Sequence, residues 1–371
     1  MIVDDTTVLL INPHKITLFE AEHLKETLPY FPDLDLTHIK RLSNLVGIAQ
    51  HAKYTIPDYH HGYCLDDNAR ALILASTAYE VSPSPDTKKL TSTYLAYIYY
   101  MQLESGIFRN FLSFDNQFLD DEGTEDSYGR TVWALGHFLR ITTQGEFTLL
   151  AKEIFLRALP HALKLRSVRA VAYSLIGLIY YLQKYPDDSD SRNHVKSLVD
   201  FLVNEYQQSL SPDWYWYEKV ISYDNAILPL SMLRAAQILQ DELIYEIGMQ
   251  SAQFLDNIIF EKEYLSTIGN LEWYRQGGTR SIFGQQPVEI ASIILLYKEL
   301  FIQQRTPVYR QRALKSFQWF FGENELGLRL YDTISKGCCD GMDSHGINFN
   351  QGAESTISFW LSYLYISQPV S

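Results

Sequence analysis

The chain has 371 residues, a formal net charge of −13 and 46% hydrophobic residues, and it contains 26 Tyr and 19 Phe. This apolar content excludes a disordered chain, and the acidic charge excludes the basic surface that nucleic acid requires. No Gly/Ser-rich or Pro-rich linker divides the sequence, so we expect an N-terminal extension, residues 1–32, followed by one large domain, residues 33–371.

The sequence carries no sign of export or of a membrane span. The N-terminus lacks a basic segment followed by an apolar core. The longest apolar runs, residues 175–182 and 290–297, are far shorter than the roughly 20 residues that cross a bilayer. The three cysteines are too few for a disulfide framework, so we expect a cytoplasmic protein.

Helices dominate the rest of the chain. The extension contains a strand-like run at residues 8–11 and a short helix near residues 19–27. Beyond it, apolar residues recur with a 3.6-residue period, and two kinds of helix alternate. Six helices are amphipathic, at residues 36–49, 87–103, 147–164, 192–209, 242–257 and 307–321. The six between them are apolar on all sides and begin near Asp66, Asp126, Ser167, Asp224, Gln286 and Gln351.

The alternation of helix types indicates the architecture. Helices that are apolar all round are buried, whereas amphipathic helices face solvent on one side. Six hairpins, each with one helix of each kind, therefore predict an all-α fold, an (α/α)6 toroid with an outer ring around an inner ring. Loops that lead into the inner helices are mostly long, about 14 to 30 residues, and all open on one face. We expect the functional site on that face.

The first of these loops is rich in side chains that bind ligands. His61 and Tyr63 precede an acid pair, Asp66 and Asp67, at the predicted start of the first inner helix. Either aspartate can act as the N-cap by accepting a hydrogen bond from a free backbone N–H group. A cap needs only one carboxylate, so the pair favours a binding site, and a plain capped core helix is the alternative.

The second inner helix repeats this pattern. Glu125 and Asp126 form another acid pair, and each of the two helices carries an arginine one turn further on, Arg70 and Arg130. We expect the arginines to contact substrate and to tune the acids. The alternative is a cap followed by an ion pair between Asp126 and Arg130, four residues apart.

Aromatic side chains gather before the fourth and fifth inner helices. Trp214, Trp216 and Tyr223 precede Asp224, and Trp273 lies in the fifth long loop. Aromatic faces stack on the C–H faces of sugar rings and leave the hydroxyls free to bind carboxylates and amides. These residues predict a sugar-binding surface, with a loop folded onto its own apolar cluster as the alternative.

Carboxylates also lie in the first turn of the last two inner helices. Glu289 follows Gln286, and Glu354 follows Gln351, in helices that are otherwise apolar. A buried carboxylate is costly unless it is paired or faces a polar cavity. We therefore expect these acids and the two glutamine amides to face the common site.

The number of acids suggests a chemistry. Cleavage of a glycosidic bond uses two carboxyl groups, one protonated and one ionised, and crowding of acids raises some of their pKa values. Asp67 and Glu354 begin the first and last inner helices, which are neighbours where the ring closes, so we predict them as the acid–base pair. Asp126, Asp224 and Glu289 are the next candidates for catalysis.

Five stretches of the sequence resemble a known superfamily: HHGYCLDDNARAL, EDSYGRTVWALG, WYWYEKVISYDNAILPLSML, GQQPVEIAS and NQGAESTISFWLSYL. They are similar to bacterial toroid domains of the six-hairpin glycosidase superfamily. In particular, they resemble domains fused to, or encoded beside, family-four-type glycosyltransferases. The resemblance spans about residues 35–366 and implies both the toroid fold and a carbohydrate-active protein.

We therefore expect a glycoside hydrolase that acts on a neutral oligosaccharide without a metal or cofactor. A non-catalytic glycan-binding or scaffolding partner of a glycosyltransferase is the alternative. An epimerase would need histidine bases on inner helices, and His137, the only one there, lies late in its helix. A zinc site of Cys64, Cys338 and Cys339 with one of the loop histidines, His60 or His61, is a further alternative, although the spacing matches no known pattern.

Overall fold

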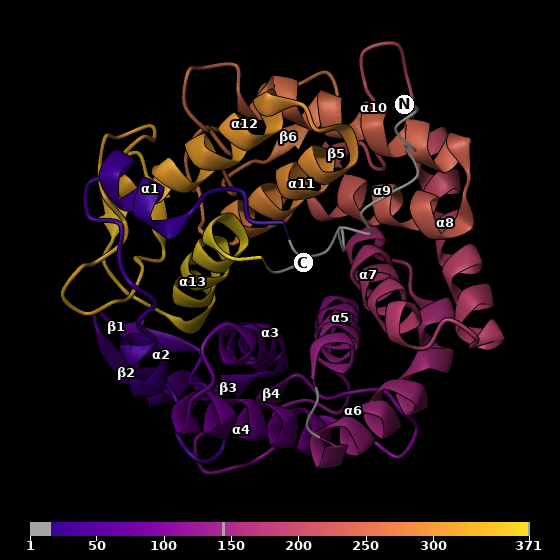
Figure 1. Cartoon of the computed structure of the whole chain (residues 1–371), viewed down its shortest axis with the longest axis vertical. Helices are drawn as coiled ribbons and strands as arrows, with labels where there is room; N and C mark the ends of the chain where they lie inside the picture. Colours follow the sequence, from indigo (N-terminus) through magenta and orange to yellow (C-terminus); the bar gives the residue numbers. More distant parts are fainter. Residues whose placement is uncertain (1–15, 143–144, 370–371) are drawn as a thin grey trace, which may run out of the picture.

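A computed structural model describes residues 16–142 and 145–369, and these form two concentric rings of helices (Figure 1). The inner ring consists of α3 (Leu65–Val81), α5 (Glu125–Ile141), α7 (Val168–Lys184), α9 (Ile227–Leu239), α11 (Val288–Gln304) and α13 (Ala353–Ser367). Each inner helix packs against the next, and α13 packs against α3, which closes the ring. The predicted (α/α)6 toroid is confirmed.

The outer ring contains the amphipathic helices. They are α2 (Thr37–Leu42), α4 (Pro85–Met101), α6 (Gly145–Ala158), α8 (Ser189–Ser209), α10 (Glu242–Ile259) and α12 (Pro307–Gln318), with 3-10 turns η2 (Leu159–Lys164) and η3 (Trp319–Phe321) after α6 and α12. Local signals start them: at α4, Ser84 and Thr87 form a reciprocal capping box and Pro85 takes the first helical position. Five of the six predicted outer helices are therefore confirmed.

The exception is the first outer helix, predicted at residues 36–49, because α2 ends at Leu42. After it, the side chain of Asn44 accepts hydrogen bonds from the backbone N–H groups of Val46 and Gly47, which turns the chain. Gly47 then packs so tightly against Asn68 that a Cβ atom would lie 2.5 Å from Asn68 Oδ1. A local turn therefore replaces the last two turns of the predicted helix.

The described part of the N-terminal extension packs against the end of the ring. Helix α1 (Ala21–Thr27) confirms the short helix predicted there. The backbone N–H of Phe19 donates to the carbonyl of Ile366 on α13, and the ring of Phe31 stacks on Tyr363. The predicted strand at residues 8–11 lies outside the described residues.

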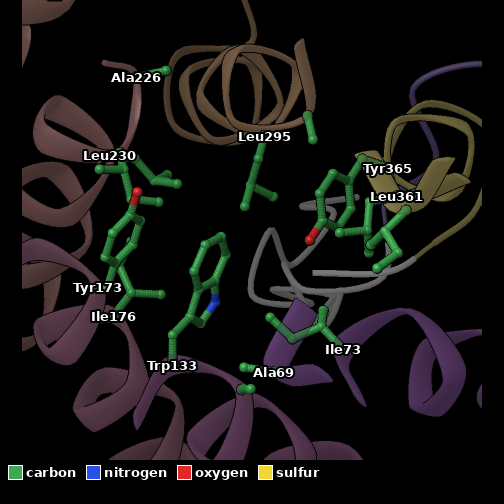
Figure 2. Packing of buried hydrophobic residues seen from close by; sticks show 14 of the residues in the cluster. Ala69, Ile73, Trp133, Tyr173, Ile176, Ala226, Leu230, Leu295, Leu361 and Tyr365 are labelled. Atoms are coloured by element: carbon green, nitrogen blue, oxygen red, sulfur yellow. The ribbon is translucent and has the colours of Figure 1, made fainter. Parts of the chain in front are cut away.

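The middle of the inner ring is filled with side chains. Figure 2 shows Trp133, Leu295 and Tyr365, from three different inner helices, directed toward a common centre, and all three are buried. Helices α5 and α7 approach most closely because Gly136 and Gly177 face each other. A Cβ atom on Gly136 would lie 2.0 Å from the Gly177 carbonyl oxygen. The toroid is therefore a solid core, and a ligand must bind at one of its ends.

Four small antiparallel sheets lie in the long loops that lead into inner helices. They pair β1 (His51–Lys53) with β2 (Ile56–Asp58), β3 (Tyr63–Cys64) with β4 (Phe111–Leu112), β5 (Val220–Ile221) with β6 (Tyr274–Arg275), and β7 (Gly341–Asp343) with β8 (Gly346–Asn348). The second and third sheets each join two successive long loops. These sheets therefore connect the loops on one face of the toroid.

No helix within the described ranges is long and apolar enough to cross a bilayer.

Candidate functional site

A cavity of about 620 Å³ opens at the starts of α3 and α13, where the ring closes. Hairpins β1–β2 and β7–β8 supply its other walls. Six of the residues predicted from sequence line it: His61, Asp66, Asp67, Arg70, Gln286 and Glu354. The structure therefore brings the predicted acid–base pair into one cavity.

One arginine joins the two predicted catalytic acids. Arg70 Nη1 lies 3.1 Å from Asp67 Oδ1, and Arg70 Nη2 lies 3.0 Å from Glu354 Oε2. The side chain of Asp67 is 5% exposed, whereas that of Glu354 is 38% exposed. The two carboxyl groups thus share a cation but differ strongly in their access to water.

This difference in environment affects protonation. Burial raises the pKa of Asp67 to about 7, and the negative charges of Glu354 and Asp66 act in the same direction, while Arg70 opposes them. The thiol of Cys64 donates to Asp67 Oδ2 over 3.1 Å. Near neutral pH, a large fraction of Asp67 is therefore protonated and can act as an acid.

Neither Asp66 nor Asp67 caps α3, although the sequence made both candidates for its N-cap. Cys64 occupies the N-cap position without a side-chain hydrogen bond, and both aspartates lie in the first helical turn. There they pair with arginines, since Arg130 Nη1 lies 2.9 Å from Asp66 Oδ1. Arg130 thus reaches across to α3, and an ion pair with Asp126 on its own helix is not formed.

Arg130 also links the cavity to a second acidic group deeper in the ring. Its Nη2 donates to the Tyr173 hydroxyl over 2.8 Å, and that hydroxyl donates to Asp224 Oδ2 over 2.5 Å. The guanidinium lies over the Tyr173 ring, 4.6 Å from its centroid. Asp66 on the cavity wall and the buried Asp224 are therefore connected through one arginine and one tyrosine.

Glu289 holds the backbone at Asp224. Its carboxyl oxygens accept hydrogen bonds from the backbone N–H groups of Asp224 and Asn225, at 2.5 and 3.4 Å. Asp224 has a φ of 45°, in the left-handed region that a non-glycine residue rarely adopts. Burial, followed by the charge of Asp224, raises the pKa of Glu289 to about 8. Glu289 thus positions Asp224 and does not line the cavity.

Asp126 is also held by neighbours outside the cavity. Its Oδ1 accepts from the Ser167 hydroxyl over 2.9 Å and its Oδ2 from the Tyr223 hydroxyl over 2.5 Å. The Tyr223 ring in turn lies 6.0 Å from that of Trp273, and both side chains are half-buried. Asp126, Tyr223 and Trp273 therefore form a cluster beside the cavity.

Four residues predicted to bind substrate lie in the protein core. Trp216 is fully buried, and the Trp214 indole N–H donates to the backbone carbonyl of Glu218. The buried hydroxyl of Tyr63 accepts from Asn44, and the side-chain amide of Gln351 is bound by Ser335 and Asp332. None of the four lines the cavity. The structure thus favours the alternative for the Trp214 loop, which folds onto its own aromatic cluster.

Several residues of the cavity wall were not predicted from the sequence, among them His51 and Asp340. His51 on β1 lies with its ring 4.7 Å from that of His61. Asp340 lies before β7, and its carboxylate accepts from the backbone N–H of Gly352. Burial raises the pKa of Asp340 to about 6, and the charge of Glu354 adds to this effect. His51 was not predicted as a site residue because it directly follows the outer helix expected at residues 36–49.

The zinc and inner-helix histidine alternatives find no support in the geometry. Within residues 16–142 and 145–369, no three His, Cys, Asp or Glu side chains are arranged to hold a metal ion. Cys64 contacts Asp67 instead, and His60 is bound to Asp58. His137 contacts Thr77, far from the cavity end of its helix.

Solved structures share this fold at low sequence identity. A sugar epimerase from a ruminal bacterium matches with 13% identity over 89% of this chain and 94% of its own, at a TM-score of 0.68. A GH76 α-mannanase from Bacteroides thetaiotaomicron matches with 12% identity over 89% and 92%, at 0.63. No family model and no curated protein matches the sequence.

A third match carries further information in its description. An α-1,6-mannanase from Salegentibacter was solved as an inactive variant, with two consecutive aspartates changed to alanine, in complex with α-1,6-mannotetrose. It matches with 12% identity over 93% of this chain and 97% of its own, at a TM-score of 0.58. These neighbours are described as a sugar epimerase and two mannanases, and this chain shares their (α/α)6 toroid fold.

Proposed function

We propose that this protein is a glycoside hydrolase that acts on a neutral oligosaccharide in the cavity at the closure of the ring. The observation that carries the proposal is the arrangement of Asp67 and Glu354 on either side of Arg70. Glycosidic cleavage needs one protonated and one ionised carboxyl group near the same bond. A buried acid and a more exposed carboxylate in one cavity meet that requirement.

In this mechanism Asp67 is the general acid. It protonates the glycosidic oxygen as the bond to the anomeric carbon breaks, and its raised pKa keeps it protonated near neutral pH. Glu354 is the carboxylate that activates a water molecule or attacks the anomeric carbon. Arg70 holds both groups in place and stabilises the negative charge that Asp67 acquires after proton transfer.

The cavity's charge supports a neutral substrate. Its wall carries five acidic side chains, Asp58, Asp66, Asp67, Asp340 and Glu354, against two cations, Lys53 and Arg70. Such a surface repels anionic sugars, whereas the amides of Gln286 and Asn350 can bind hydroxyl groups. The inactive mannanase variant lacks two consecutive aspartates, and Asp66 and Asp67 are a consecutive pair in the cavity wall of this chain.

The test is a hydrolysis screen against neutral oligosaccharides that includes α-1,6-mannotetraose and cellotetraose. We expect release of new reducing ends by the wild type. Asp67→Asn and Glu354→Gln should each reduce kcat by at least about 100-fold, the usual lower range for loss of a general acid or base. Asp241→Asn, which alters the N-cap of outer helix α10, is the control. Unchanged rates in both active-site variants would refute the assignment.

A specific observation also favours a second candidate, an epimerase. His51 and His61 line the same cavity with their rings 4.7 Å apart, and a histidine imidazole can exchange a proton with a sugar carbon. Several toroid neighbours are described as epimerases or isomerases. NMR of the incubated sugars separates the two activities, because an epimerase changes the configuration at one carbon without releasing a new reducing end.

A third outcome of the same screen is saturable binding without any product. That result would favour a non-catalytic glycan-binding partner of a glycosyltransferase.

For the location we propose the cytoplasm, because Cys64, Cys338 and Cys339 are all free thiols, as expected in a reducing compartment.

A further inference from the structure

A second cavity, of about 210 Å³, lies at the opposite end of the inner ring. Its wall comes from the last turns of α7, α9 and α11 and includes Tyr180, Arg234, Lys298 and Glu299. An inner helix of 17 residues is roughly 25 Å long, so this cavity is well separated from the glycan cavity at the helix starts. None of its residues takes part in the proposed hydrolysis.

Two of its cations keep unused hydrogen-bond donors. Arg234 donates from Nε to Glu299 over 2.9 Å and from Nη1 to the hydroxyl of Tyr180. The Lys298 ammonium donates to the carbonyls of Tyr365 and Gln368, each over 3.0 Å. Among the described residues, no partner is found for Arg234 Nη2 or for the third ammonium proton. Both side chains are more than nine-tenths buried.

In the part of the chain that the structure describes, positive charge exceeds negative charge around this cavity. The charged and titratable groups that face it or pack beside it are Glu80 on α3, His137 and Arg140 on α5, Tyr180 on α7, Arg234 on α9, Lys298 and Glu299 on α11, and Tyr365 on α13. The guanidinium groups of Arg140 and Arg234 both lie over the Tyr180 ring, at 4.0 and 4.8 Å. Glu299 is the one buried carboxylate among these groups.

The pKa of Lys298 reflects the same excess of positive charge. Burial lowers its pKa to about 7, and the charges of Arg234 and Arg140 lower it further than Glu299 raises it. The electrostatic potential at the ammonium group is therefore positive. An anion in the cavity would offset that potential and raise the pKa of Lys298.

Capping of a helix end accounts for two hydrogen bonds of Lys298, but not for the hollow beside it. Lys184 also donates to carbonyls at the C-terminal end of an inner helix, those of Leu139 and Thr142. It satisfies the ends of α5 in the same way that Lys298 satisfies those of α13, yet it does not line the cavity. The hollow beside Lys298 and Arg234 needs a separate explanation.

We propose that this cavity is a binding site for a small oxyanion of the sulfate or phosphate class. Arg234 Nη2 and the third proton of Lys298 are its charge-assisted donors, and the amide of Gln183 at the cavity edge completes the set. Gln237 also lines the cavity, but its amide donates to Glu299 over 3.3 Å. The volume of about 210 Å³ is enough for a tetrahedral oxyanion with some of its hydration. This site does not depend on the proposed glycan chemistry.

The test is isothermal titration calorimetry with inorganic sulfate at constant ionic strength and pH 7.5. Sulfate has no titrating proton near neutral pH, so any proton uptake belongs to the protein. We expect saturable binding of one sulfate per chain. We also expect a heat that changes with the ionisation enthalpy of the buffer, because Lys298 takes up a proton when the anion binds.

A matched pair of variants gives the second readout. Lys298→Met should weaken sulfate binding by about tenfold or more and remove the proton uptake, since it removes a charge-assisted donor and the group that titrates. Lys184→Met should keep the wild-type affinity within about twofold. No saturable binding, a buffer-independent heat in the wild type, or an equal loss in both variants would overturn the proposal. The buffer dependence remains decisive even if Lys298→Met does not fold.

Discussion

Replacing Asp67 with asparagine should stabilise the protein at alkaline pH while it removes the catalytic acid. The pKa of Asp67 is about 7 in the folded protein against an ordinary value of 3.8. Between these values the folded state holds a proton that the unfolded state has released. Folding stability therefore falls as the pH rises through this window, and the neutral amide does not share that loss.

The size of the effect follows from the two pKa values. The loss between pH 5 and pH 8 is roughly 2.5 kcal/mol, at about 1.4 kcal/mol for each unit of pKa difference. With about 2.1 cal/mol/K of unfolding entropy per residue over 371 residues, this corresponds to a shift of about 3 °C in Tm. The Tm of Asp67→Asn should thus rise by about 3 °C relative to wild type as the pH goes from 5 to 8.

Differential scanning calorimetry of both proteins at pH 5, 6, 7 and 8 measures this shift. Asp213→Asn, in an exposed loop, is the control for exchanging a carboxylate for an amide. A Tm difference between Asp67→Asn and wild type that stays constant over this range, or that changes in the opposite direction, would refute the raised pKa and with it the acid role of Asp67.

Three further changes test other parts of the structure. Glu289→Gln should retain most of the free energy of unfolding because a neutral side chain suits that site. Glu289→Ala leaves two backbone N–H groups without a partner and should lower the free energy of unfolding by about 1–3 kcal/mol for each of them. Urea unfolding of both variants measures the difference. Trp216→Ala should destabilise the folded protein by about 3–5 kcal/mol and leave its affinity for glycans unchanged. Thermal unfolding measures the first effect and glycan titration the second. Gly136→Ala should lower Tm through overpacking against α7, by an amount equivalent to about 1–3 kcal/mol, while Gly145→Ala, in open space, should not.

The toroid could be predicted because the pattern of apolar residues along a helix shows how much of its surface is buried. Helices such as α7, apolar on all sides, and α8, apolar on one, show directly which ring they belong to. The small sheets could not be predicted in this way, because strands of two or three residues are too short to show a pattern. The early end of α2 depends on a single turn at Asn44, which the apolar periodicity conceals.

The candidate site was partly predictable for a topological reason. Closure of the ring brings the starts of the first and last inner helices together, so Asp67 and Glu354 were expected to be close. The partners of the arginines were not predictable, because Arg130 reaches across to Asp66 on another helix while a nearer acid, Asp126, was available in sequence. Aromatic residues likewise did not predict the position of the site, since Trp216 packs in the core.

The most direct test of the proposed function is a crystal structure of Glu354→Gln with a neutral oligosaccharide that the wild type cleaves. We predict that two sugar rings occupy the cavity at the closure of the ring, with the glycosidic oxygen between them about 2.6–3.2 Å from a carboxyl oxygen of Asp67. A sugar bound elsewhere on the protein, or one whose glycosidic oxygen lies out of reach of Asp67, would contradict the proposal.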